Sequence, residues 1–136
     1  MNEYEKQAIE FCEKTNTRWE ITFLRKGRYF PDDNANRNIY YISLYREKHG
    51  SMHFTFGDSI ANTQQHKRPN IYDILACLTT YDPGSDVWEF AREFGYEIHD
   101  KKSYKQCQKT FNAVREEWEN VQRVFGDVLE KLAEIQ

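Results

Sequence analysis

Two histidines four residues apart, His49 and His53, are the side chains whose spacing raises the question of a metal site. Imidazole is a common zinc ligand, but a zinc site takes at least three ligands from the protein. The intervening Gly50 and the alternating residues around it predict a hairpin, and no third ligand follows nearby in the sequence. We therefore expect no metal ion and no cofactor.

Carboxylates and thiols are the other groups that could carry out catalysis. Asp32 and Asp33 lie in a Pro-Asp-Asp-Asn run that is typical of a turn, and Asp58 is isolated, whereas general acid-base catalysis needs groups that converge. The sequence contains three cysteines, Cys12, Cys77 and Cys107. Each is surrounded by apolar residues, which is typical of reduced core thiols. No P-loop, dinucleotide fingerprint or nucleophile elbow is present, so we expect no catalytic residues and a protein that is not an enzyme.

Basic residues are concentrated in one part of the chain. From Lys14 to Arg68 there are ten Lys and Arg against five Asp and Glu, although the whole chain of 136 residues has a net charge of −3. The same stretch holds the runs in which apolar and polar residues alternate, so these basic residues fall on and around predicted strands. Because charge asymmetry affects association rather than fold, this pattern predicts a binding surface.

The order of the periodic segments predicts one α+β domain over 1–136. Helical spacing of apolar residues indicates a helix over 1–15, alternation indicates an antiparallel sheet over 17–57, and further helical patterns follow over 70–136. We expect a three-stranded sheet that is covered on one face by the N-terminal helix and several C-terminal helices. The longest helical stripe consists of Tyr104, Cys107, Phe111, Val114, Trp118 and Val121. We expect it to pack on the sheet and on neighbouring helices, with Trp118 in the core.

The register of the predicted hairpin follows from its apolar residues. A three-residue loop over 48–50, with Gly50 in the left-handed conformation, places Leu44 opposite Phe54. Five apolar residues then share one face: Ile42, Leu44, Met52, Phe54 and Phe56. A loop of two or four residues would divide them between the two faces, which a half-buried sheet does not allow.

The opposite face of the predicted sheet is the candidate binding surface. Its side chains are Tyr41, Ser43, Tyr45, Ser51, His53 and Thr55, next to Glu20, Thr22 and Lys26 of the first strand. Antiparallel pairing is expected to bring the cations that follow the first strand to the same end of the sheet as the cation of the hairpin loop. The residues expected to contact a partner are therefore Tyr41, Tyr45, His53, Arg25, Lys26, Arg28 and Lys48. The alternative interpretation is an ordinary solvated face, since tyrosine favours strands whatever its function.

Cations beside exposed aromatic rings are also the combination that binds nucleic acid, where phosphates meet the cations and bases stack on the rings. The net negative charge and the absence of an RNP-like or helix-turn-helix motif argue against this function. Binding of single-stranded nucleic acid by the same face is the alternative to a protein partner. A small enzyme or a nucleotide-binding protein with a pocket between sheet and helices is a third class.

Several runs of the sequence carry a resemblance to a family. The run YDILACLTTYDPG, which starts at Tyr72, and the later runs EFAREFGYE and EEWENVQRVF resemble small uncharacterised accessory proteins of phages, prophages and conjugative elements in gut Firmicutes and related bacteria. The likeness extends over RYFPDDNANRNIYYISLYR and HFTFGDSI, and so covers most of the chain. The resemblance brings no catalytic motif. It implies accessory cargo, the class that includes anti-CRISPR and other anti-defence proteins.

The expected function is therefore that of a non-enzymatic inhibitor from a mobile element. Its expected partner is a host defence protein or ribonucleoprotein complex, such as a CRISPR effector. No stretch of the sequence approaches the length of a membrane span, and the N-terminal residues are acidic and amphipathic where a signal peptide would be basic and then apolar. We expect no membrane partner and a location in the cytoplasm of the host bacterial cell.

Overall fold

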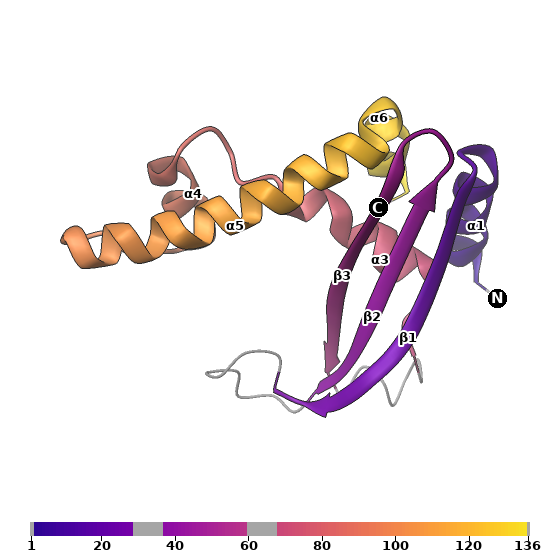
Figure 1. Cartoon of the computed structure of the whole chain (residues 1–136), viewed down its shortest axis with the longest axis horizontal. Coiled ribbons are helices and arrows are strands. Elements are labelled where there is room, and N and C mark those ends of the chain that lie inside the picture. The colour runs from indigo at the N-terminus through magenta and orange to yellow at the C-terminus, as the bar shows by residue number, and fades with distance from the viewer. Residues whose placement is uncertain (1, 29–36, 60–67, 136) are drawn as a thin grey trace.

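The computed structural model describes residues 2–28, 37–59 and 68–135 of the chain (Figure 1). The elements are, in order, α1 (Glu3–Lys14), β1 (Thr17–Gly27), β2 (Arg37–Arg46), β3 (Gly50–Ser59), α3 (Ile71–Leu78), η1 (Thr79–Tyr81), α4 (Val87–Phe94), α5 (Lys101–Phe125), η2 (Gly126–Val128) and α6 (Leu129–Glu134). The strands form one antiparallel sheet in the order β1-β2-β3. The expected α+β fold, with a three-stranded antiparallel sheet and helices on both sides of it in the sequence, is confirmed.

The main core lies between one face of the sheet and the helices α1, α3, α5 and α6. The sheet contributes alternate residues of β2 and β3, namely Tyr40, Ile42, Leu44, Met52 and Phe54. The helices contribute buried residues at helical spacing, among them Phe11, Ile74, Leu78, Val121, Phe125 and Leu132. Because strand side chains alternate between faces, the other face of the sheet carries mainly polar and aromatic residues, with Ile39, 2% exposed, near the beginning of β2.

The hairpin between β2 and β3 differs in register from the predicted one. Leu44 pairs with Met52 and not with Phe54. The turn begins one residue earlier than predicted, and Lys48 adopts a positive φ of 72° in addition to Gly50, which has a φ of 96°. The predicted pairs were therefore wrong by two positions. A shift of two preserves the alternation, so the apolar residues that were expected to face the helices still do.

A second, smaller core lies away from the sheet, in a part of the fold that we call the arm: α4 and residues 101–114 of α5. Figure 1 shows α4 lying along the beginning of α5, to one side of the sheet. The buried residues of this core are Val87, Phe90, Ala91, Cys107 and Phe111. The apolar stripe, which was expected to pack on the sheet and on neighbouring helices, is divided between two cores, since Phe111 faces α4 while Val121 belongs to the main core. Trp118 is only half-buried against the main core.

One buried cation ties the hairpin to the helices. Arg46, 4% exposed, lies at the end of β2 on the core side of the sheet. Its Nε donates a hydrogen bond to the Thr15 carbonyl at 3.1 Å, and its Nη1 donates to the Val124 carbonyl at 2.6 Å. The two Nη atoms also donate to the Asp127 carboxylate, at 2.5 and 3.1 Å. Arg46 therefore joins β2, the end of α1 and the end of α5.

This contact predicts a dependence of stability on pH. The hydrogen bond and charge of Arg46, with a smaller contribution from His49, lower the pKa of Asp127. A carboxyl group with a lowered pKa in the folded state stabilises the fold above its unfolded pKa of about 4, and this contribution is lost as the pH falls through the folded pKa. Asp127→Asn should therefore lower the urea midpoint at neutral pH, and the difference from the wild type should shrink below about pH 4.

The matched control for this prediction is Glu130→Gln, which removes an exposed carboxylate from the neighbouring α6. It should leave the urea midpoint unchanged within error across the same pH range. A difference between wild type and Asp127→Asn that stays constant down to low pH would contradict the prediction, because the carboxylate's charge would then contribute nothing.

Candidate functional site

The face of the sheet opposite the main core, which we call the outer face, carries three rows of side chains from the three strands. The pairing places Arg18 beside Tyr45 and Ser51, then Glu20 beside Ser43 and His53, then Thr22 beside Tyr41 and Thr55. This arrangement brings Tyr41, Tyr45 and His53 together on one face, as the alternation of the sequence predicted.

The aromatic side chains of the outer face are held by contacts with one another and with their neighbours. The Tyr41 ring stacks on the His53 imidazole, with centroids 5.7 Å apart and an interplanar angle of 6°. His53 Nδ1 and the Ser43 hydroxyl are hydrogen-bonded at 3.1 Å. The Arg18 guanidinium lies 4.5 Å from the centroid of the Tyr45 ring. Both tyrosines stay 39% exposed, so each ring is fixed on one side and open on the other.

A shallow pocket of ≈ 260 Å³ lies on the outer face beside Tyr45 and His53. Its lining includes Arg18, Glu20, Tyr45, Ser51 and His53. The lining combines aromatic, hydroxyl and oppositely charged groups, which is a composition suited to contact with a protein surface.

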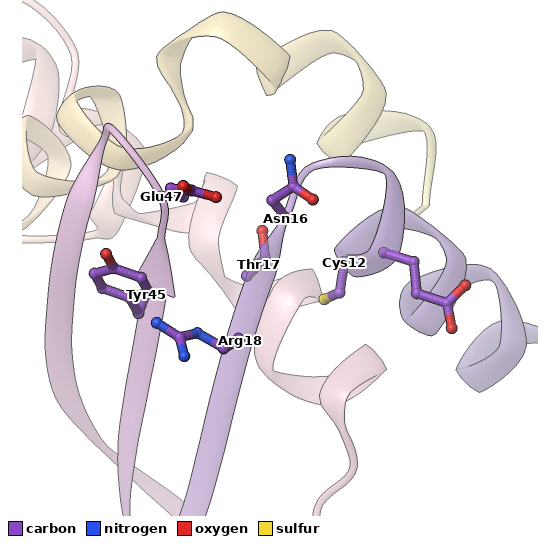
Figure 2. A pocket seen from close by; sticks show the side chains of 7 residues that line it. Cys12, Asn16, Thr17, Arg18, Tyr45 and Glu47 are labelled. Atoms are coloured by element: carbon purple, nitrogen blue, oxygen red, sulfur yellow. The ribbon is translucent and has the colours of Figure 1, made fainter.

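A larger pocket, of ≈ 510 Å³, lies at the hairpin end of the sheet and shares Arg18 and Tyr45 with the outer face. Figure 2 shows the Arg18 side chain extending toward the Tyr45 ring, with Glu47 beyond them and Cys12 contributed by α1. Burial raises the pKa of Cys12 to about 12. Its thiol therefore stays protonated at neutral pH and is not activated as a nucleophile.

The thiols of Cys77 and Cys107 also have raised pKa values. Burial raises the pKa of Cys77 to about 11 and raises that of Cys107 as well. All three are free thiols. The remaining candidates for catalysis, Asp32, Asp33 and the side chain of Asp58, lie outside the described part of the chain.

The basic residues of the predicted site do not lie together. Arg25 pairs with Ile39, near the far end of β1, whereas Lys48 lies in the turn next to Arg46. Ile39 and Arg46 are seven positions apart in β2, which corresponds to roughly 23 Å. The expectation that antiparallel pairing brings Arg25, Lys26 and Arg28 to the same end as Lys48 was therefore wrong. The reason is that β1 starts beside the hairpin turn and runs away from it.

An irregularity in β1 also exchanges two cations between faces. The register shifts between Phe23 and Arg25, which places Arg25 opposite Ile39 and Lys26 opposite Asn38. Because a bulge reverses the alternation beyond it, Arg25 lies on the same face as Tyr41, and Lys26 lies on the other face. The prediction that Lys26 lies on the outer face is therefore wrong.

Arg18 is the residue of this face that sequence reasoning missed. Its guanidinium packs on Tyr45, so it belongs to the site more directly than Arg28 or Lys48 does. The alternation of β1 places Arg18 on the same face as Glu20, which is the signal that could have found it.

The described residues hold neither a cluster of metal ligands nor a membrane-spanning helix. Within 2–28, 37–59 and 68–135, no group of three His, Cys, Asp or Glu side chains could hold a metal ion. His49 lies 3.7 Å from Asp127, while His53 contacts Ser43, so the two histidines have separate partners. No helix in these ranges is both long and apolar enough to cross a bilayer.

Comparisons of the chain with protein-family models, with curated protein sequences and with solved structures found no match.

Proposed function

We propose that this protein is a non-enzymatic binding protein that contacts a protein partner through the outer face of its sheet. The resemblance to accessory proteins of mobile elements suggests the partner: a component of a host defence complex, which the protein inhibits in the manner of an anti-CRISPR protein. The observation that carries the proposal is the pair Tyr41 and Tyr45, each held on one side and exposed on the other.

Tyrosines in this state are suited to anchor an interface. Tyr, Trp and Arg dominate the binding energy of protein interfaces, and side chains that are ordered before binding lose little entropy when a partner arrives. The stacking of Tyr41 on His53 and of Arg18 on Tyr45 supplies that order in the free protein. The outer face therefore presents two preorganised aromatic anchors.

The charges of the outer face favour a protein over a nucleic acid as its partner. Arg18 and Glu20 flank Tyr45 in neighbouring rows, so their charges balance. The cations that were predicted to form the site lie at opposite ends of the sheet, with Arg25 and Lys26 at one end and Lys48 at the other. They do not form a continuous row of positive charge beside the aromatic rings. A nucleic acid would require such a path, because phosphate contacts dominate its affinity.

The proposal is tested by replacing Tyr41 and Tyr45 together by serine. In bacteria whose CRISPR immunity blocks a phage, the wild-type protein should restore plaque formation. The double variant should lose this activity, since truncation of each anchor costs about 2 kcal/mol of binding free energy, or roughly 30-fold in affinity. Both side chains are partly exposed, so the urea midpoint should change little.

Tyr4→Ser is the matched control, because Tyr4 is an exposed tyrosine on α1. It should retain full inhibition. Full inhibition by the double variant would contradict the proposal. Failure of the wild-type protein to restore plaque formation in any strain with active CRISPR immunity would also contradict it. A partner whose affinity falls steeply with salt would indicate nucleic acid at this face instead.

A further inference from the structure

The beginning of α5 carries a concentration of positive charge inside the acidic part of the chain. Residues 98–110 contain one aspartate, Asp100, against four lysines, Lys101, Lys102, Lys105 and Lys109, a balance of +3. All four lysines are exposed. None of them forms an ion pair with a carboxylate among the described residues.

These lysines do not stabilise the helix that carries them. The N-terminal end of a helix bears a partial positive charge, so Lys101 and Lys102 in the first turn are unfavourable there. Lys101, Lys105 and Lys109 follow one another at intervals of four, which places like charges on one side of the helix, where they repel. No acidic residue in the first turn offsets them, and Asp100 is engaged as the cap, accepting the Ser103 N–H at 2.7 Å. A charge pattern that opposes local stability points to a function.

An aromatic pocket lies beside the same lysines. Trp88 of α4 is 58% exposed, and its ring centroid lies 5.6 Å from that of Tyr104 in α5. The two rings line an open pocket of ≈ 460 Å³ together with Ile98, His99, Asp100, Lys101, Lys105 and Gln108. Trp88 is not one of the buried residues of the arm's core, so its ring face is available to a ligand.

We propose that this side of the arm binds single-stranded nucleic acid. A base would stack on Trp88 and Tyr104, and the sugar-phosphate backbone would follow the row formed by Lys101, Lys105 and Lys109. Aromatic platforms beside a row of cations are the combination that binds single strands without sequence preference. An acidic protein segment would use the lysines but not the exposed ring faces, and an apolar partner would not need the lysines.

This site is separate from the outer face of the sheet. The arm extends to one side of the sheet, as Figure 1 shows, and its pocket shares no residue with the pockets of the sheet. A protein with both surfaces could contact the protein and the nucleic acid of one ribonucleoprotein complex. The arm site does not depend on that proposal and can be tested with purified components.

The experiment measures binding of a fluorescent oligothymidylate of about ten nucleotides and of an abasic strand of the same length, over a range of salt concentrations. Trp88→Ala should weaken oligothymidylate binding by about 10-fold and leave abasic binding unchanged, because only bases stack. Replacing Lys101, Lys105 and Lys109 by Gln should weaken binding of both strands. It should also reduce the slope of log K against log salt by about 2, because each phosphate that a cation neutralises on a single strand contributes about 0.7 to that slope.

The matched charge control replaces three exposed lysines on other helices by Gln: Lys6, Lys14 and Lys131. Phe94→Ala is the aromatic control, since Phe94 is exposed on α4 but lines a different pocket, with Glu89 and Glu93. Both controls should bind like the wild type. The proposal is overturned if the wild type binds neither strand, if the two triple variants have the same slope, or if Trp88→Ala weakens both strands equally. It is also overturned if polyglutamate competes as well as oligothymidylate does, because the site would then recognise acidic chains in general.

Discussion

Phe125→Ala is expected to destabilise the fold by about 3 to 5 kcal/mol, the range for removal of a large aromatic side chain from a core. Phe125 is 0% exposed at the end of α5. Its ring stacks on Phe11 of α1, with centroids 6.4 Å apart, and lies 5.7 Å from the Arg46 guanidinium. Truncation would leave a cavity where α1, α5 and β2 meet, and the total stability of such a domain is only about 5 to 15 kcal/mol.

The measurement is the urea midpoint at neutral pH, with two comparisons. Phe125→Leu keeps most of the volume and should cost much less than alanine. Trp88→Ala removes an aromatic side chain of greater size that is mostly exposed, so it should change the free energy of unfolding by no more than about 0.5 kcal/mol. An alanine variant at Phe125 as stable as the one at Trp88 would mean that this core does not hold the helices to the sheet.

The contrast between Phe125 and Trp118 shows how far helical periodicity can predict a core. The apolar stripe through α5 is evident in the sequence, and its spacing predicts Trp118, near its middle, as a core residue. In the structure the stripe passes from one core to the other near its middle, so Trp118 is half-buried while Phe111 and Phe125 are buried in different cores. Periodicity identifies the apolar side of a helix, but which partner covers each turn depends on contacts distant in sequence.

The outer face was predictable because strand alternation is local. A period of two places Tyr41, Tyr45 and His53 on one face whatever the exact register, which is why an error of two positions in the hairpin left the prediction intact. The basic residues were not predictable in the same way. Their positions depend on the direction of β1 relative to the hairpin and on a bulge before Arg25, and neither feature has a strong signal in the sequence.

The basic surface of the arm could not be predicted from the net charge of the C-terminal half, which is negative. Residues 69–136 contain eight Lys and Arg against thirteen Asp and Glu, and this acidic total conceals the four lysines at the start of α5. The proximity of Trp88 to Tyr104 also requires α4 to fold back along α5, which sequence spacing does not reveal. The basic surface with the clearest aromatic neighbours is therefore on a helix of the acidic part.

Arg46→Met is expected to destabilise the fold by about 3 kcal/mol. Methionine retains much of the buried length of the side chain but none of its donors, so the carbonyls of Thr15 and Val124 would lose their hydrogen bonds to Arg46. A hydrogen bond to a charged group contributes about 1.5 to 3 kcal/mol. Loss of the Asp127 ion pair should add little, because that carboxylate is 46% exposed and water can solvate it. The rule that directs Ile42 and Leu44 inward also directs Arg46 inward, so its burial follows from the alternation of β2.

Urea denaturation of Arg46→Met, Arg46→Lys and Arg123→Met tests this role. Lysine keeps the charge but lacks the planar set of donors that reaches both carbonyls and the carboxylate at once, so Arg46→Lys should fall between wild type and Arg46→Met. Arg123 is exposed and donates a hydrogen bond to the Ser51 carbonyl at 2.9 Å. Arg123→Met is therefore the matched control, because it makes the same substitution at the same end of the sheet in an exposed side chain. Arg123→Met should cost less than about 1 kcal/mol. If the two methionine variants are equally stable, Arg46 does not hold the hairpin to the helices.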